Sequence, residues 1–107
     1  MPESVKVGPW EYAVSTTAAG HLAAESSVGS RLNGLSHAAQ ATIHIDPNAV
    51  TQFQRSTMIH EVIHQVFEAS GWAPSPDDTE EMVCRALSTG LLGVLRENPG
   101  LVRWLTA

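Results

Sequence analysis

Two histidines and a glutamate in this sequence have a spacing that can build a metal site. The chain reads His60-Glu61-Val62-Ile63-His64, and in a helix both imidazoles then project from one face and can bind the same metal ion. Glu61 between them can reach a metal-bound water and accept its proton, which is the chemistry of a zinc hydrolase. A catalytic zinc takes three protein ligands and leaves its fourth position to water. The rest of the chain must therefore supply one more ligand.

A second helix after the motif is expected to carry that third ligand. Glu80 lies 16 residues after His64, enough for one helix to end, a turn to form and a second helix to return across the first. In that second helix Glu80 falls on the inward stripe that contains Val83 and Leu87, where a buried carboxylate is costly unless a metal ion satisfies it. Glu81 lies at the border of the same stripe, so both glutamates are candidates.

The same residues also have interpretations that involve no metal. Asp77 and Glu80 match a capping box at the start of a helix, and an acidic first turn also complements the helix dipole. Asp77 and Asp78 are weaker ligand candidates. The histidine pair would then be two half-buried imidazoles, and Glu61 would be an exposed residue of the helix surface. The spacing of the three motif residues favours the metal site over these interpretations.

Local sequence patterns predict the elements that position these residues. Alternating apolar residues indicate strands, and helix formers between capping and stop signals indicate helices. Residues 29–40 read as a loop because they are rich in Gly, Ser and Asn. Strands are expected over 5–15, with a break at Gly8-Pro9, and over 41–46, and helices over 17–27, 51–70 and 76–97.

The motif helix has recognisable ends and one apolar face. Residues 51–54 have the form of a capping box, and Gly71 supplies a stop signal. At about 100° per residue, His60 and His64 fall at the edge of the apolar arc, and Glu61 falls one step farther out. The histidines are therefore expected at the border between core and solvent, at the floor of a groove.

Length and composition narrow the class of protein. A chain of 107 residues is expected to form one domain, residues 1–107, around a single core. No apolar run approaches the ~20 residues of a membrane span, and the first residues lack the features of a secretory signal, so a cytoplasmic location is expected. A net charge of −5, with six scattered Lys and Arg, argues against nucleic-acid binding. One cysteine, Cys84, cannot form an internal disulfide.

Four segments together resemble one protein family. The first consists of Gly34 and the end of the strand that follows it, residues 43–47. The others are the motif segment 57–64, the segment 79–83, and residues 92–105, which include Arg96-Glu97-Asn98-Pro99. In these segments the chain resembles the small HExxH metallopeptidases of the gluzincin type, in particular short phage and mobile-element proteins related to the ImmA/IrrE-like group. The resemblance spans most of the chain from about residue 5.

The resemblance implies both a fold and a site. The fold would be α+β, a small, twisted, mainly antiparallel sheet packed on the HExxH helix and on the following glutamate helix. One catalytic zinc ion would be bound by His60, His64 and Glu80, with Glu61 as general base. An edge strand, taken to be residues 41–46, would bind an extended peptide or protein substrate.

One departure from the family leads to an alternative function. Related enzymes often have Asp or Asn four residues after the ligand glutamate, where that side chain orients a zinc-bound histidine, and this chain has Cys84 there. We therefore expect a zinc-dependent endopeptidase or, as the alternative, a non-catalytic protein-binding module that zinc staples together. A zinc hydrolase acting on a non-peptide bond is a third expectation. The sequence does not indicate the oligomeric state.

Overall fold

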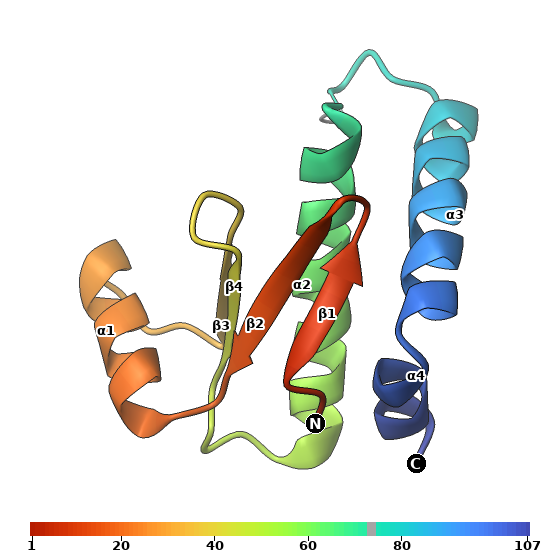
Figure 1. The fold of residues 1–107 in the computed structure, drawn as a ribbon. Coiled ribbons are helices and arrows are strands. Elements are labelled where there is room, and N and C mark those ends of the chain that lie inside the picture. Colours follow the sequence, from red (N-terminus) through yellow and green to blue (C-terminus); the bar gives the residue numbers. More distant parts are fainter. Residues whose placement is uncertain (73–74) are drawn as a thin grey trace.

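A computed structural model of the protein describes residues 1–72 and 75–107, except for the side chains of Glu80, Glu81, Cys84, Arg85 and Ser88. In this part of the chain, four helices and four strands form the predicted α+β fold (Figure 1). In chain order they are β1 (Ser4–Val7), β2 (Trp10–Ser15), α1 (Ala18–Val28), β3 (Gly34–His37), β4 (Thr42–Ile45), α2 (Thr51–Ser70), α3 (Glu80–Glu97) and α4 (Pro99–Thr106). None of these described helices is long and apolar enough to cross a membrane.

The strands form one mixed sheet in the order β1-β2-β4-β3. β1 pairs antiparallel with β2, β3 pairs antiparallel with β4, and β2 pairs parallel with β4. The predicted mainly antiparallel sheet is therefore confirmed, with one parallel pair at its centre. The predicted break in the first strand is also confirmed, because the turn between β1 and β2 contains Gly8 with a positive φ of 56°, a conformation that glycine adopts without strain.

Two predictions about the other side of the sheet are wrong. Residues 29–40 are not all loop, because β3 forms within them. The strand predicted over 41–46 exists as β4, but it is not an edge strand, since it pairs with β2 on one side and with β3 on the other. The free edge on this side of the sheet belongs to β3.

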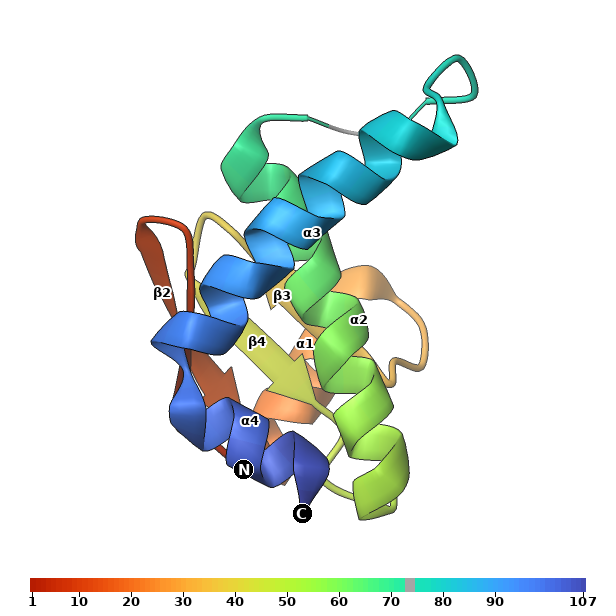
Figure 2. The ribbon, with the colours of Figure 1, turned by 90° about the vertical axis from the view of Figure 1, so that its right-hand side faces the viewer.

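Helices lie on both faces of the sheet. α2 and α3 cover one face, and α1 lies on the other face beside β4 (Figure 1, Figure 2). The alternating side chains of β4 follow these layers, because Ile43 and Ile45 are buried in the core with α2, whereas His44 points toward α1. A Cβ added to Gly20 of α1 would lie 3.7 Å from His44 Nδ1. His44 is therefore on the face of the sheet opposite the motif.

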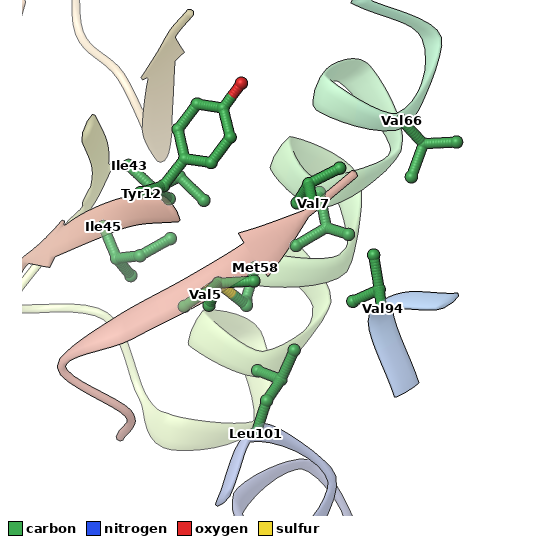
Figure 3. Close-up of a cluster of buried hydrophobic side chains, with 10 residues drawn as sticks. Val5, Val7, Tyr12, Ile43, Ile45, Met58, Val66, Val94 and Leu101 are labelled. Carbon is green, nitrogen blue, oxygen red and sulfur yellow. The ribbon is translucent and has the colours of Figure 1, made fainter. Parts of the chain in front are cut away.

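The hydrophobic core fills the space between the sheet and the helices α2, α3 and α4 (Figure 3). Full burial of one Val, Ile, Leu or Met side chain stabilises the fold by about 1.5–3 kcal/mol. Of the HExxH motif only Val62 belongs to this core, so His60, Glu61 and His64 lie on the neighbouring sides of the same helix. The buried members are Val5, Val7, Tyr12, Ile43, Ile45, Met58, Val62, Val66, Val94 and Leu101.

The ends of α2 agree only in part with the sequence signals. The helix spans the predicted range and ends at Gly71, which has a left-handed φ of 69° and donates its backbone N–H to Glu68 O. The capping box predicted over 51–54 is wrong, because the N-cap position is held by Val50, which has no side-chain oxygen to cap with. No side chain caps the start of α2, and its first turn is tied instead to the end of β4, since Gln54 Nε2 donates to Asp46 O at 2.9 Å.

α3 begins later than predicted. It starts at Glu80 instead of residue 76, because Thr79 holds the N-cap position and its Oγ1 accepts a hydrogen bond of 3.3 Å from Met82 N. A capping box of Asp77 with Glu80 is therefore not formed. The residues before the helix make a turn instead, in which Ser75 N donates to the Asp78 carboxylate at 2.6 Å.

Two contacts fix α3 against its neighbours. Gly90 lies directly on α2, since a Cβ added to it would be only 2.2 Å from Val66 Cγ1. At the other end of α3, the side chain of Asn98 accepts from Lys6 N and donates to Lys6 O, each at 2.8 Å, and also donates to Val94 O. Asn98 therefore pairs with the backbone of β1 as a neighbouring strand would, and joins that edge of the sheet to the helices.

Candidate metal centre

His60 and His64 bring two imidazole nitrogens together on the exposed side of α2. Their Nε2 atoms are 3.1 Å apart, and their ring planes meet at 74°. Two nitrogen ligands of a tetrahedral zinc, with bonds of about 2.0–2.1 Å, stand about 3.3 Å apart. The donor atoms of His60, Glu61 and His64 all lie within 4.8 Å of one another. These three residues therefore form a group that can hold a metal ion.

Glu61 lies deeper in the structure than the two histidines. It is only 7% exposed, whereas both histidines are exposed, so the prediction that Glu61 points farther toward solvent is wrong. The reason is β3, which runs alongside α2 at this level. A Cβ added to Gly34 would lie 2.6 Å from Thr57 Cγ2 and 3.5 Å from Glu61 Cγ. The absence of a side chain at Gly34 lets the strand approach closely enough to cover the carboxylate.

A chain of three hydrogen bonds holds Glu61 from the side of the sheet. Ser36 Oγ of β3 donates to Glu61 Oε1 at 2.8 Å. Gln65 Nε2 donates to Ser36 Oγ at 2.7 Å, and the Tyr12 hydroxyl donates to Gln65 Oε1 at 2.7 Å. Burial, followed by the negative charge of Glu68, raises the pKa of Tyr12, so its hydroxyl stays protonated as a donor to a higher pH than an ordinary tyrosine does. Each member fixes the next, so the carboxylate is held in one orientation.

Two adjoining hollows flank Glu61, and together they form what we call the groove. The first has a volume of about 380 Å³ and is lined by Arg31, Leu32, Asn33, Gly34, Phe53, Ser56, Thr57, His60 and Glu61. The second has a volume of about 440 Å³ and is lined by Gly34, Leu35, Ser36, Glu61, His64, Gln65 and Glu68. Both hollows share Gly34 and Glu61, so the groove runs between β3 and α2 with the motif at its middle.

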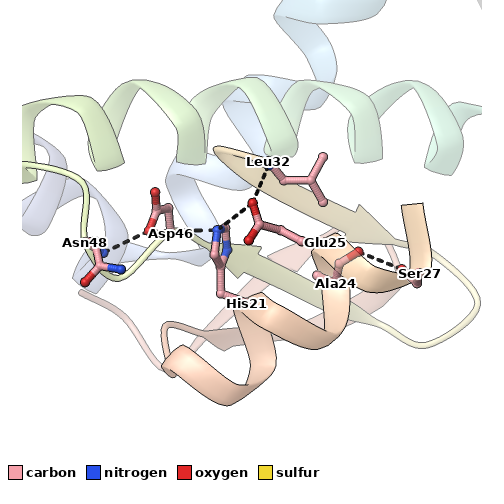
Figure 4. Close-up of polar contacts among 7 residues, drawn as sticks. All are labelled: His21, Ala24, Glu25, Ser27, Leu32, Asp46 and Asn48. Carbon is pink, nitrogen blue, oxygen red and sulfur yellow. Dashed lines mark hydrogen bonds and ion pairs between the residues drawn. The ribbon is translucent and has the colours of Figure 1, made fainter. Parts of the chain in front are cut away.

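A second polar cluster lies on the α1 side of the sheet (Figure 4). His21 Nε2 lies 3.6 Å from Glu25 Oε2 and 3.8 Å from Asp46 Oδ1. The same Glu25 oxygen accepts from Leu32 N at 2.9 Å, and Asp46 N donates to Asn33 O at 2.9 Å. The cluster therefore fixes the segment before β3, which lines one end of the groove, to α1 and to the end of β4.

The contacts of the described residues do not test the predicted third ligands, Glu80 and Glu81. The side chains of Glu80 and Glu81 lie outside the described residues, so their roles stay predictions. Glu68, in contrast, is described, and it lines the same hollow as His64, from which it is one helical turn away. It is therefore a further carboxylate to test as a ligand.

The sequence reasoning missed two residues that hold Glu61. Gln65 had a signal, since it lies four residues after Glu61 and so shares its side of α2. Ser36 had none, because it lies in a polar segment that reads as a loop. Its role depends on β3, which forms only through pairing with β4.

No profile of a known protein family matches this chain, and comparisons with curated proteins and with solved structures also found no match. What supports the family resemblance is thus the motif itself, whose residues His60, Glu61 and His64 do lie together. The function must be argued from the geometry of this group and of the groove around it.

Proposed function

We propose that this protein is a zinc-dependent, peptidase-like hydrolase in which His60 and His64 bind the metal and Glu61 is the general base. The observation that carries the proposal is the 3.1 Å separation of the two Nε2 atoms beside a buried carboxylate held by Ser36. Imidazole and carboxylate are donors that suit zinc. When bound, zinc supplies a water with its pKa lowered toward ~7 and polarises the substrate carbonyl.

Glu61 would carry the proton through the reaction. Its carboxylate accepts a proton from the attacking water as the water oxygen bonds to the carbonyl carbon of the substrate. It then gives that proton to the amide nitrogen as the carbon–nitrogen bond breaks, so that a carboxylic acid and an amine are released. Ser36 supports both steps because its hydroxyl holds Oε1 and thereby fixes the direction of the carboxylate.

We assign the third ligand position to Glu80, with Glu81 and Glu68 as the competing carboxylates. Glu68 competes because it follows His64 by one turn and lines the same hollow. Calorimetric zinc titration of Glu80→Ala, Glu81→Ala and Glu68→Ala variants separates them, since the loss of a ligand should lower zinc affinity by more than about 100-fold. Unchanged affinity in the Glu80 variant would remove it from the site.

The substrate would be an extended peptide that binds along β3. This strand is the edge of the sheet beside the motif, and the backbone groups of a free edge can pair with an added strand. The groove between β3 and α2 would receive the side chains of the peptide. β3 therefore takes the role that the sequence had led us to expect for residues 41–46.

The test is hydrolysis of a peptide library by the zinc-loaded protein and its variants. Glu61→Gln should keep zinc bound and lose at least about 1,000-fold in kcat/KM, since it removes the general base, and His60→Ala should lose zinc as well. Glu97→Gln is the matched control, because Glu97 is an exposed carboxylate at the far end of α3. Full activity in the Glu61 variant would refute the mechanism.

The alternative, a non-catalytic module stapled by zinc, makes a contrasting claim about stability. A structural zinc ion contributes folding energy, and a domain that depends on it unfolds when the metal is removed. The exposure of His60 and His64 speaks for the hydrolase, because neither proposed metal ligand is a member of the hydrophobic core.

A further inference from the structure

We propose that the groove selects peptides by charge, with a basic side chain on the N-terminal side of the cleaved bond and an acidic side chain on its C-terminal side. Glu68 would meet the basic residue, and Arg31 would meet the acidic one. The inference rests on the proposed function and adds a substrate class to it.

The two ends of the groove carry opposite charges. Arg31 lines the hollow beside His60, and Glu68 lines the hollow beside His64. Glu61 lies in both hollows, so its charge does not distinguish them. Among the described residues that line the groove, no other Asp, Glu, Lys or Arg is present. The ends therefore differ by one positive and one negative side chain.

The length of the groove matches a short extended peptide. Phe53 and Glu68, which line its two ends on α2, are 15 residues apart, which corresponds to about 22 Å along a helix. An extended chain advances about 3.3 Å per residue, so about six or seven residues span this distance. Side chains of one hexapeptide can therefore reach both charged ends.

The direction of β3 sets which end receives which part of the peptide. Gly34 lies against Glu61, while Ser36, farther along the strand, contacts Gln65, which is one turn farther along α2. β3 thus runs in the same direction as α2. A peptide paired antiparallel to β3, as β4 already is and as strands pair more often, runs the opposite way. Its N-terminal residues then lie at the Glu68 end, and its C-terminal residues lie at the arginine end.

The segment that carries Arg31 is held in place on its C-terminal side. Leu32 N donates to the Glu25 carboxylate at 2.9 Å (Figure 4). Asn33 O accepts from Asp46 N, also at 2.9 Å. The guanidinium of Arg31 therefore extends from a backbone that is fixed to α1 and to the end of β4. Its forked donors match the geometry of a carboxylate.

The experiment measures the binding of two peptides that have the same composition and the same net charge. The probes are capped, fluorescently labelled Lys-Lys-Ala-Ala-Glu-Glu and Glu-Glu-Ala-Ala-Lys-Lys. Binding is followed by fluorescence anisotropy with the zinc-loaded Glu61→Gln protein, in which the peptides stay intact. Because both peptides are equally charged overall, the net charge of −5 of the protein does not favour either one.

The peptide that begins with lysine should bind about tenfold more tightly than the peptide that begins with glutamate. Each of its two exposed ion pairs, with Glu68 and with Arg31, should raise the affinity about threefold. Adding Arg31→Glu and Glu68→Lys to the same protein should reverse the preference. The matched control swaps an exposed pair away from the groove, Lys6→Glu with Glu11→Lys, and should leave the preference unchanged. Zinc content is measured for each variant, because Glu68 is also tested as a ligand.

The inference and the proposed function fail in different ways. Equal affinities for the two peptides, tighter binding of the reversed peptide, or the same preference after the swap of Arg31 and Glu68 would overturn the charge selection. A preference that reverses as expected, together with no hydrolysis of either peptide by the zinc-loaded wild type, would instead support the groove as a charge-selective binding site and count against the hydrolase.

Discussion

Ser36 Oγ donates a hydrogen bond of 2.8 Å to Glu61 Oε1, and this contact joins two residues that are 25 positions apart in the sequence. It links the free edge strand of the sheet to the carboxylate between the two histidines. Because Ser36 is itself held by the buried amide of Gln65, its hydroxyl is not free to turn away. The edge strand therefore has two roles in the site: it borders the groove, and it orients the proposed base.

Removing the Ser36 hydroxyl should weaken catalysis without removing the metal. A hydrogen bond to a charged group contributes about 1.5–3 kcal/mol, so Ser36→Ala should lower kcat/KM by about tenfold or more. Zinc affinity should stay within about twofold, because Ser36 donates to Glu61, which is proposed as the base and not as a metal ligand. Ser36→Thr keeps the hydroxyl and should restore most of the activity. Equal activity in the alanine and threonine variants would contradict the role of this contact.

Removal of the metal should leave the fold intact. His60 and His64 are exposed and are not members of the buried core, so the chelated protein should keep its far-ultraviolet circular dichroism and unfold cooperatively. Its stability should fall only by the binding energy of the metal, about 2.7 kcal/mol at a free zinc concentration 100 times Kd. An unfolded chelated protein would favour the zinc-stapled module instead.

The stability of the fold should decrease as the pH falls below the ordinary pKa of histidine. Burial, then the charges of His37 and His21, lowers the pKa of His44 below 6.5 in the folded protein. The unfolded chain then binds a proton at His44 at a higher pH than the folded one does, so acidification favours unfolding. The slope from this residue is at most about 1.4 kcal/mol per pH unit.

Urea unfolding of the metal-free protein between about pH 7.5 and pH 5.5 checks the role of His44. His44→Gln should make the pH dependence shallower. His37→Gln should have a smaller effect in the same direction, because its charge is only one of the causes of the lowered pKa. A pH dependence unchanged in the His44 variant would show that burial of this imidazole does not contribute.

The parts of the fold that sequence patterns predicted are those with strong local periodicity. The motif helix, the first helix and the strand that became β4 were predicted within about two residues, because each has a run of apolar residues or a clear stop signal. β3 was missed since its four residues, Gly34–His37, are half-buried and polar in part. Its pairing with β4 decides its structure, and that pairing is not local.

The same distinction applies to the candidate site. His60 and His64 could be predicted to lie side by side, because residues four positions apart share one face of a helix. The burial of Glu61 could not be predicted, because it depends on the close approach of β3 to α2 at Gly34. The angular position of a residue indicates which other residues lie on its face of the helix. The tertiary fold decides which strand or helix covers that face.

Two glycines of α3 provide a matched test of how this helix packs on α2. A Cβ at Gly90 would lie 2.2 Å from Val66 Cγ1, whereas a Cβ at Gly93 would meet nothing within 4 Å. Gly90→Ala should therefore destabilise the protein by about 1–3 kcal/mol through overpacking. Gly93→Ala should stabilise it by about 0.5–1 kcal/mol through higher helix propensity. Thermal and urea unfolding measure both, and equal effects of the two substitutions would contradict the close approach of α3 to Val66.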